Sequence, residues 1–301
     1  MLARFLIVVL ALQLGLFWAA GLALCARLGW PAWWSLAFAP AGVLVLEALT
    51  VAQSFALSRL YAGGAPQAAR LSWGGRLRLF CCELGAYVLL FTFMQPFARR
   101  RVSGAAVSGM PVVLVPGIYC NAGLWGWMRR RLAKLGVAGT WAVTLEPPRA
   151  GIDALAERLA QEIARVCAAA GAQRVVVVGH SMGGLVARAC LRDPAARARI
   201  ARIVTLGTPH HGSALALWGI GQNARQMRPG SAWLAALNAG ATDGVPVVSV
   251  FSWHDNFVAP QDSPALAGAQ NVPLAGIGHL SLAFSDEVAR RVAAEVAAAQ
   301  K

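Results

Sequence analysis

Charged residues are scarce in this 301-residue chain: they make up 13% of it, whereas a soluble globular protein carries about 25%. The deficit is concentrated in residues 1–103, which contain nine arginines, no lysine and only two acids, Glu47 and Glu83. Residues 104–301 hold eighteen basic and eleven acidic residues, which is close to an ordinary composition. The break falls in a Gly/Ala/Ser stretch near position 103. We therefore expect a membrane region over 1–103 and a separate domain over 110–301.

Motifs for metal binding by cysteine and for nucleic-acid binding are also missing. The six cysteines follow no Cys-x-x-Cys or Cys/His ligand spacing, which favours buried free thiols; Cys120 is the one thiol near a candidate site, where it could be reactive. No aromatic–basic platform or nucleic-acid-reading motif accompanies the net charge of +14. That charge therefore favours membrane lipids over nucleic acid as the partner.

Long uncharged runs fill the first hundred residues. Residues 5–26 carry no charge, and about 20 apolar residues suffice to span a bilayer. Residues 31–57 form a second candidate span. A third apolar segment, about 79–98, contains Glu83 and leaves only eleven uninterrupted apolar residues, which favours an interfacial or re-entrant helix. Glu47 lies near the middle of the second span, where an acid indicates a functional site, or else is protonated or hydrogen-bonded to a neighbouring helix.

The arginines that flank the apolar segments indicate how the chain is oriented in the membrane. Four arginines lie in the loop 59–78, and Arg99, Arg100 and Arg101 follow the third segment. If only the first two segments span, both basic clusters and the N-terminus lie on the cytoplasmic side. We therefore expect a multi-pass membrane protein with a two-span hairpin and a C-terminal domain that faces the cytoplasm.

Short β-branched runs alternate with helical patterns from Met110 onward. Candidate strands are 111–117, 140–146, 174–179, 200–207, 245–252 and 269–276. Helical patterns lie between them at about 123–135, 152–170, 182–192 and 281–299. Near-continuous apolar strands separated by amphipathic helices predict an α/β domain, with a mostly parallel six-stranded sheet covered on both faces. Such sheets bind ligands at the carboxyl ends of their strands.

The third predicted strand ends in Gly-His-Ser-Met-Gly, which matches the pattern G-x-S-x-G. Between a strand and a helix this pattern predicts a nucleophile elbow, with Ser181 as the nucleophile. A nucleophilic serine needs a base, and the base needs an orienting acid. Asp255 follows the fifth strand and His279 the sixth, in the order that this architecture expects. The rival acids are Asp262 and Asp243, and the rival bases are His254 and His211.

Two backbone N–H groups are candidate oxyanion donors. Met182 directly follows the nucleophile, and Ile118 follows the first strand beside Gly117. His210 and His211 follow the fourth strand and therefore approach the same edge of the sheet. Together with Asp255 or His254 they could supply metal ligands. His180, inside the elbow, is expected to pack.

Residues 213–240 are rich in Leu, Ala, Trp and Met and lie between two strands. They could form a lid or wall over an acyl pocket, or an ordinary pair of crossover helices. In the first case Arg225 and Arg228 could meet an anionic lipid head group; solvated arginines are the equal alternative.

Five segments together resemble the α/β-hydrolase superfamily: VVLVPGIYCNAGLW, VVVVGHSMGGLVAR, IVTLGTPHHGS, WHDNFVAP and GHLSL. They are most similar to its bacterial lipase and esterase branch, and also to the inositol-deacylase domain of GPI processing. The resemblance covers roughly residues 110–299. It implies a compact six-stranded hydrolase fold, a triad of Ser181, Asp255 and His279, and a structural role for the TPHHGS loop, without metal or cofactor. We expect the bacterial inner membrane as the location.

Two departures from that branch matter. The domain has no room for the first two strands of the full fold, and the branch's secreted members lack the N-terminal membrane region. We expect a membrane-anchored serine hydrolase that cleaves acyl esters, above all those of lipids. The alternatives are an acyltransferase or thioesterase with the same triad, or a membrane interaction protein with a vestigial hydrolase domain. The oligomeric state is not predicted.

Overall fold

The computed structural model describes residues 1–98, 109–137, 139–240, 242 and 244–300. The predicted linker near position 103, the arginines at 99–101 and the rival acid Asp243 lie outside the described residues.

Six strands form one sheet in the order β2-β1-β3-β4-β5-β6, and every neighbouring pair is parallel. The strands are β1 (Val112–Val115), β2 (Thr140–Ala142), β3 (Val175–His180), β4 (Ile200–Leu206), β5 (Val247–Ser252) and β6 (Gln270–Leu274). The predicted six-stranded parallel sheet is therefore confirmed. Because all strands run the same way, their carboxyl ends meet at one edge of the sheet.

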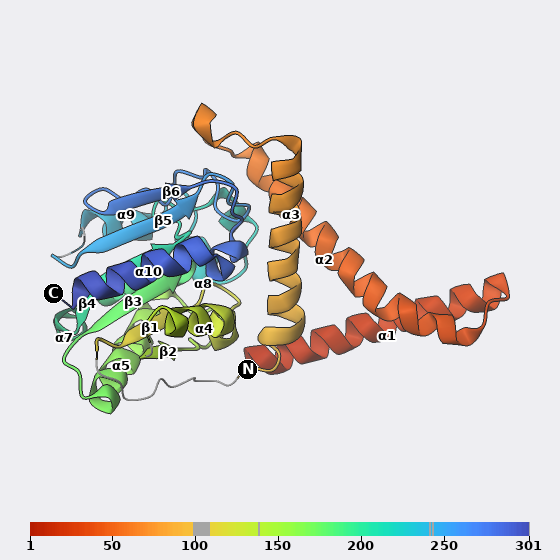
Figure 1. Ribbon diagram of the computed structural model, residues 1–301, viewed down its shortest axis with the longest axis horizontal. Helices are drawn as coiled ribbons and strands as arrows, with labels where there is room; N and C mark the ends of the chain where they lie inside the picture. Colours follow the sequence, from red (N-terminus) through yellow and green to blue (C-terminus); the bar gives the residue numbers. More distant parts are fainter. Residues whose placement is uncertain (99–108, 138, 241, 243, 301) are drawn as a thin grey trace.

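Helices cover both faces of this sheet (Figure 1). The longer ones are α4 (Gly126–Lys134), α5 (Ile152–Ala170), α6 (Met182–Cys190) and α10 (Asp286–Ala299). The shorter ones are η4 (Ala122–Trp125), α7 (Pro194–Ala198), η5 (Ala214–Leu217), α8 (Gln222–Gln226), α9 (Ala232–Ala239) and η6 (Leu280–Phe284). The expected helix over 281–299 is thus two elements, because Ser285 ends the first and caps α10 by accepting a hydrogen bond from Val288 N.

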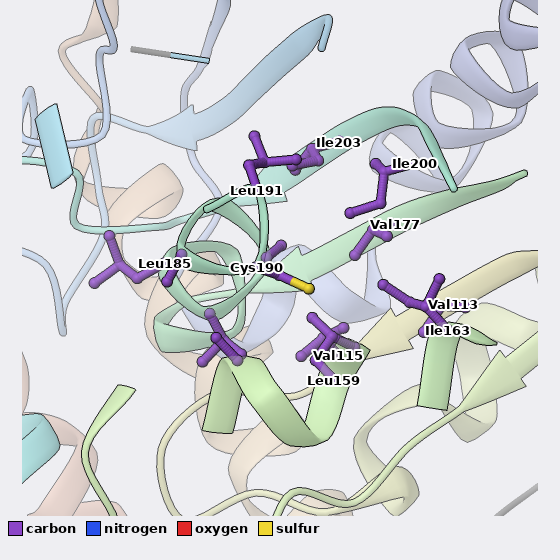
Figure 2. Close-up of a cluster of buried hydrophobic side chains, with 14 of the residues drawn as sticks. Val113, Val115, Leu159, Ile163, Val177, Leu185, Cys190, Leu191, Ile200 and Ile203 are labelled. Carbon is purple, nitrogen blue, oxygen red and sulfur yellow. The ribbon is translucent and has the colours of Figure 1, made fainter. Parts of the chain in front are cut away.

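Alternate residues of the central strands supply two separate cores. Val113, Val115 and Val177 point toward α5 and α6, where they pack with Leu159 and Leu185 (Figure 2). The residues between them in β1 and β3 point to the opposite face, against α4 and α10. This period-two alternation, with both sides apolar, is what a sheet buried on both faces requires.

The first two apolar segments form a helical hairpin that extends away from the α/β domain (Figure 1). Helix α1 (Leu2–Leu28) and helix α2 (Ser35–Leu60) are joined through the short turn η1 (Ala32–Trp34). A side chain at Gly42 would overlap the ring of Phe17, so this glycine lets the helices approach closely. Trp18 Nε1 donates a hydrogen bond to Ser35 Oγ at 3.0 Å. Both ends of the hairpin lie beside the α/β domain: the amino group of Met1 pairs with the Glu146 carboxylate at 2.7 Å, and Gly63 N, just after α2, donates to Gln261 Oε1 at 3.3 Å.

The third apolar segment is longer than the eleven-residue run suggested. Helix α3 (Trp73–Val88) continues through a π-helical turn, η3 (Leu89–Met94), giving 22 helical residues. Glu83 does not interrupt it, because its carboxylate is hydrogen-bonded to the α/β domain. By length and composition, three helices of the described chain could cross a membrane. One face of this continuous helix is nevertheless occupied: Ala86 of α3 and Leu90 of η3 belong to the core between the sheet and α10.

Glu47, in the second segment, has a partner in a neighbouring helix. Thr92 Oγ1 donates a hydrogen bond to Glu47 Oε1 at 2.7 Å. The interhelical hydrogen bond considered from the sequence is therefore present.

Candidate active site

Ser181 stands in the sharp turn between β3 and α6. Its backbone has φ 54° and ψ −126°, a conformation that non-glycine residues rarely adopt. A side chain at Gly179 would overlap the backbone of residues 183 and 184, and one at Gly183 would overlap the carbonyl oxygen of Val115. Both glycines of the pattern are therefore required by the close approach of β3, α6 and β1, and the turn presents Ser181 at the carboxyl edge of the sheet.

Asp255 and His279 meet at the same edge. His279 Nδ1 lies 2.7 Å from Asp255 Oδ2, and both side chains are buried. The other oxygen, Asp255 Oδ1, accepts from the backbone N–H groups of Phe257 at 2.8 Å and Val258 at 2.7 Å. Three donors thus fix the carboxylate, and its bond to Nδ1 leaves Nε2 as the ring nitrogen that can accept a proton.

Burial lowers the pKa of His279, but the neighbouring carboxylates of Asp255 and Glu83 outweigh it and raise that pKa above its ordinary value. The rivals lie elsewhere. His254 is engaged through Nδ1, which accepts from Gly276 N at 3.1 Å, and Asp262 is exposed. Of the candidates considered from the sequence and described here, only Asp255 and His279 form an acid–base pair.

The two candidate oxyanion donors lie close to the serine: Ile118 lines the same cavity, and Met182 directly follows Ser181. Ile118 lines the cavity with Ser181, and its N–H has no hydrogen-bond acceptor among the described residues. Met182 is the first residue of α6, so its N–H belongs to the free donors of a helix start. Cys120 lines the cavity as well, but burial raises the pKa of its thiol to about 12, which keeps it protonated and unreactive at neutral pH.

A cavity of about 360 Å³ contains Ser181 and His279, and its lining is mostly apolar. Part of the wall comes from the predicted lid segment, through Leu215, Ala216 and Met227. Movement of this segment as a lid stays a prediction. Another part of the wall comes from the N-terminal helices: Thr50 of α2, Tyr87 of α3 and Phe91 of η3 line the cavity as well.

Sequence reasoning missed the side chains that hold the His279 backbone. His180 Nε2 donates to the carbonyl oxygen of His279 at 3.0 Å, and the N–H of His279 donates to Asn256 Oδ1 at 3.0 Å. Burial, followed by the charge of His279, lowers the pKa of His180 to about 3, so this ring is neutral and its role goes beyond packing. Glu83 accepts from the next two N–H groups, Leu280 at 2.8 Å and Ser281 at 2.9 Å. The only sequence feature that pointed to the role of Glu83 was the presence of an acid in an apolar segment.

The TPHHGS loop is held by protein groups. His210 is fully buried between Arg188 Nη1 and Thr205 Oγ1, each 3.2 Å from a ring nitrogen. His211 Nδ1 lies 3.0 Å from the carbonyl oxygen of Ser263. Among the described residues, no three His, Cys, Asp or Glu side chains gather as a metal site.

Comparison with known proteins agrees with this architecture. Residues 155–273 match the family described as PGAP1-like alpha/beta domain. A lipase from Bacillus licheniformis superposes with a TM-score of 0.56 at 18% identity, covering 64% of this chain and 95% of the lipase. This domain has the α/β-hydrolase fold. An esterase from Thermogutta terrifontis (TM-score 0.51, 18% identity, 67% of this chain and 100% of the esterase) shares the α/β-hydrolase fold. Lipase B from Aspergillus fumigatus shares it too (TM-score 0.52, 22% identity, 58% of this chain and 48% of the lipase).

The hydrolase domain confirms the resemblance seen in the five sequence segments. The expected compact form is also present, because β1 is the first strand of the described domain and is followed directly by the loop that carries Ile118.

Proposed function

We propose that this chain is a membrane-anchored serine hydrolase that cleaves acyl esters of lipids through an acyl-serine intermediate. The observation that carries the proposal is the buried Asp255–His279 pair, whose histidine lines one apolar cavity with a serine held in a nucleophile elbow. These are the nucleophile, base and orienting acid that acyl transfer needs.

The steps follow from the geometry. His279 Nε2 accepts the proton of Ser181 while Oγ attacks the ester carbonyl, and Asp255 stabilises the imidazolium. The carbonyl oxygen becomes an oxyanion that accepts hydrogen bonds from the N–H groups of Ile118 and Met182. His279 then protonates the leaving alcohol. Water attacks the acyl-serine with His279 as the base again, which releases the carboxylic acid and restores Ser181.

The proposal of a lipid substrate is supported by the cavity's surroundings. Its walls include residues of α2 and α3, and its rim continues into a turn whose side chains are apolar and exposed: Leu217, Trp218 and Ile220. Exposed apolar patches beside a binding cavity mark membrane or partner contacts. An acyl chain could pass from the bilayer into the cavity along this side.

The anchor would be the α1–α2 hairpin. Both of its ends lie at the hydrolase domain, so two crossings place the N-terminus and this domain on one side of the membrane. Arg4, Arg59 and the arginines up to Arg78 lie on that side, and Arg27 lies at the far end of the hairpin. The positive-inside rule then assigns the hydrolase domain to the cytoplasm. In this arrangement α3 lies along the hydrolase domain rather than across the bilayer.

A fluorophosphonate probe on the detergent-solubilised full chain tests the mechanism. The wild type should take one label, mapped to Ser181 by peptide mass spectrometry, and Ser181→Ala should lose labelling and ester turnover together. Ser231→Ala, outside the cavity, is the matched control and should label like the wild type. A label on Ser213, the other serine of the described cavity lining, would show the assignment to be wrong. Labelling without ester turnover would favour acyl transfer to another acceptor.

A further inference from the structure

Three segments of the proposed active site, all apart from the turn that carries Ser181, are each tied to the N-terminal apolar region by a buried polar side chain. Ser54 of α2 accepts a hydrogen bond from Asn256 Nδ2 at 2.7 Å, next to Asp255. Gln95, which follows η3, accepts from Asn121 N at 2.8 Å, at the end of the oxyanion loop. Glu83 of α3 binds the segment that follows His279. The N-terminal apolar region therefore helps to hold the loops around the proposed active site.

Glu83 makes the densest of these contacts. Its Oε1 accepts from Leu280 N at 2.8 Å, while Oε2 accepts from Ser281 N at 2.9 Å and from Ser281 Oγ at 2.7 Å. The side chain is fully buried. Burial raises the pKa of the Glu83 carboxyl, and the three donors that converge on it oppose this shift by stabilising the ionised form. A side chain at Gly278 would overlap this carboxylate, so the glycine before His279 admits it.

We propose that Glu83 is a positioning residue for catalysis, which sets the place of the His279 ring from the neighbouring apolar helix; this rests on the proposed function. The backbone around His279 is held at consecutive points: its own N–H by Asn256, its carbonyl by His180, and the next two N–H groups by Glu83. Asp255 orients the ring within its plane, and Glu83 fixes the main chain from which the ring projects. Removal of that support allows the ring to shift relative to Ser181.

Replacement of the carboxylate by its amide is the direct test. Glu83→Gln keeps the volume, but one acceptor oxygen becomes an NH₂ that faces backbone donors. A displacement of about 1 Å in a catalytic group costs about 10²-fold, so we expect kcat for a soluble ester to fall by about that factor with little change in KM. The acid limb of the pH–rate profile should also move to lower pH, because the charge of Glu83 contributes to the raised pKa of His279.

Two further variants separate positioning from packing. Glu83→Asp keeps the charge but shortens the reach, so kcat should fall while the acid limb moves less than in Glu83→Gln. Ser281→Ala removes one hydrogen bond, and a loss of about 1 kcal/mol corresponds to a fall of about fivefold in kcat. This milder variant serves if Glu83→Gln does not fold. Glu157→Gln, an exposed acid on α5, is the control and should behave like the wild type.

The outcomes are distinguishable. A wild type that takes no fluorophosphonate label and turns over no ester contradicts the proposed function. An active wild type, together with a folded Glu83→Gln protein of unchanged kcat and unchanged pH profile, contradicts only the role of Glu83. A fall in kcat without any shift of the acid limb would reduce Glu83 to a packing residue and also overturn the inference.

A second cavity carries an independent inference. It has a volume of about 490 Å³ and lies where the loop after α2 meets the start of α3 and the loop after β5. Its wall includes the rings of Phe55, Phe80 and Trp253. Three arginines also line it, Arg59, Arg70 and Arg76, and none of them pairs with an acid among the described residues.

The acids nearby leave this charge uncompensated. Asp255 borders the cavity, but its carboxylate is already bound to His279 and two backbone N–H groups. Asp262 lies beside Gly63 at the rim and forms no ion pair with a described arginine. Guanidinium groups around an aromatic wall suit a phosphate ester that carries apolar substituents. We infer that this cavity binds the phosphate of an anionic phospholipid, at the end of the hairpin where head groups would lie.

Native mass spectrometry of the solubilised full chain can test this with dihexanoyl phosphatidic acid, dihexanoyl phosphatidylcholine and inorganic phosphate. We expect the phosphatidic acid to bind, and Arg59→Gln/Arg70→Gln/Arg76→Gln to weaken that binding at least tenfold. The control removes three arginines elsewhere: Arg4→Gln/Arg27→Gln/Arg78→Gln. Equal binding of inorganic phosphate would assign the site to free phosphate. Equal loss in the control, or equal binding of the phosphatidylcholine, would overturn the inference.

Discussion

Replacement of Asp255 by asparagine should abolish most of the catalysis while leaving the fold intact. The carboxylate accepts three hydrogen bonds, two from the N–H groups of Phe257 and Val258 and one from His279 Nδ1. Asparagine can keep the first two only if its oxygen stays on that side, which turns its NH₂ toward His279. The ring must then carry its proton on Nε2, and it can no longer accept the proton of Ser181. In triad enzymes this wrong tautomer lowers kcat by about 10⁴-fold, which is about 5 kcal/mol of transition-state stabilisation.

Hydrolysis of a soluble p-nitrophenyl ester by the detergent-solubilised protein measures this loss. Asp262→Asn, which changes the exposed rival acid, should retain the wild-type rate. The reasoning is refuted if a folded Asp255→Asn protein keeps more than a tenth of the wild-type kcat, or if Asp262→Asn loses as much. Circular dichroism on the same samples establishes that the fold is retained.

Three further predictions concern pH, the membrane and the elbow. The neutral form of His279 acts as the base in the proposed mechanism, and the pKa of this ring is raised above the ordinary 6.5. We therefore expect kcat/KM to fall as the pH drops through a midpoint above 6.5. A midpoint below 6.5 in the pH–rate profile would contradict this. The double change Trp218→Ser and Ile220→Ser should lower the hydrolysis of vesicle lipids at least tenfold, because each apolar side chain buried in the membrane contributes about 1.5–3 kcal/mol. Hydrolysis of soluble esters should stay unaffected. Equal losses on both substrates would argue against a membrane contact. Gly183→Ala should destabilise the protein by about 1–3 kcal/mol, measured by denaturant unfolding, whereas Gly64→Ala, which meets open space, should not.

The sequence predicted the sheet and the strand-end positions of Ser181, Asp255 and His279, because both rest on local patterns. Runs such as VVVV before Gly179 allow little besides a buried strand, and G-x-S-x-G then fixes a turn. Asp255 and His279 could be placed because they follow strands whose carboxyl ends share one edge.

What the sequence could not predict depends on contacts between distant segments. Glu83 was interpreted as an interruption of an apolar run, because nothing in the local sequence indicates a hydrogen-bond partner 197 residues away. The length of the third helix was underestimated for the same reason. His180 was assigned to packing, since its bond to the His279 carbonyl exists only when β3 and the loop after β6 lie together.

The bond between Glu83 and Leu280 also constrains the order of biosynthesis. At about 5–20 residues per second, the ribosome needs tens of seconds to make the 197 residues that separate them. During that interval the apolar helices have emerged, and the Glu83 carboxylate has none of its final donors. The α/β domain can close around this carboxylate only after residues 280 and 281 have been synthesised. The support of the His279 segment by Glu83 therefore forms late relative to the apolar helices, and a chain released before residue 279 retains the hairpin but lacks His279.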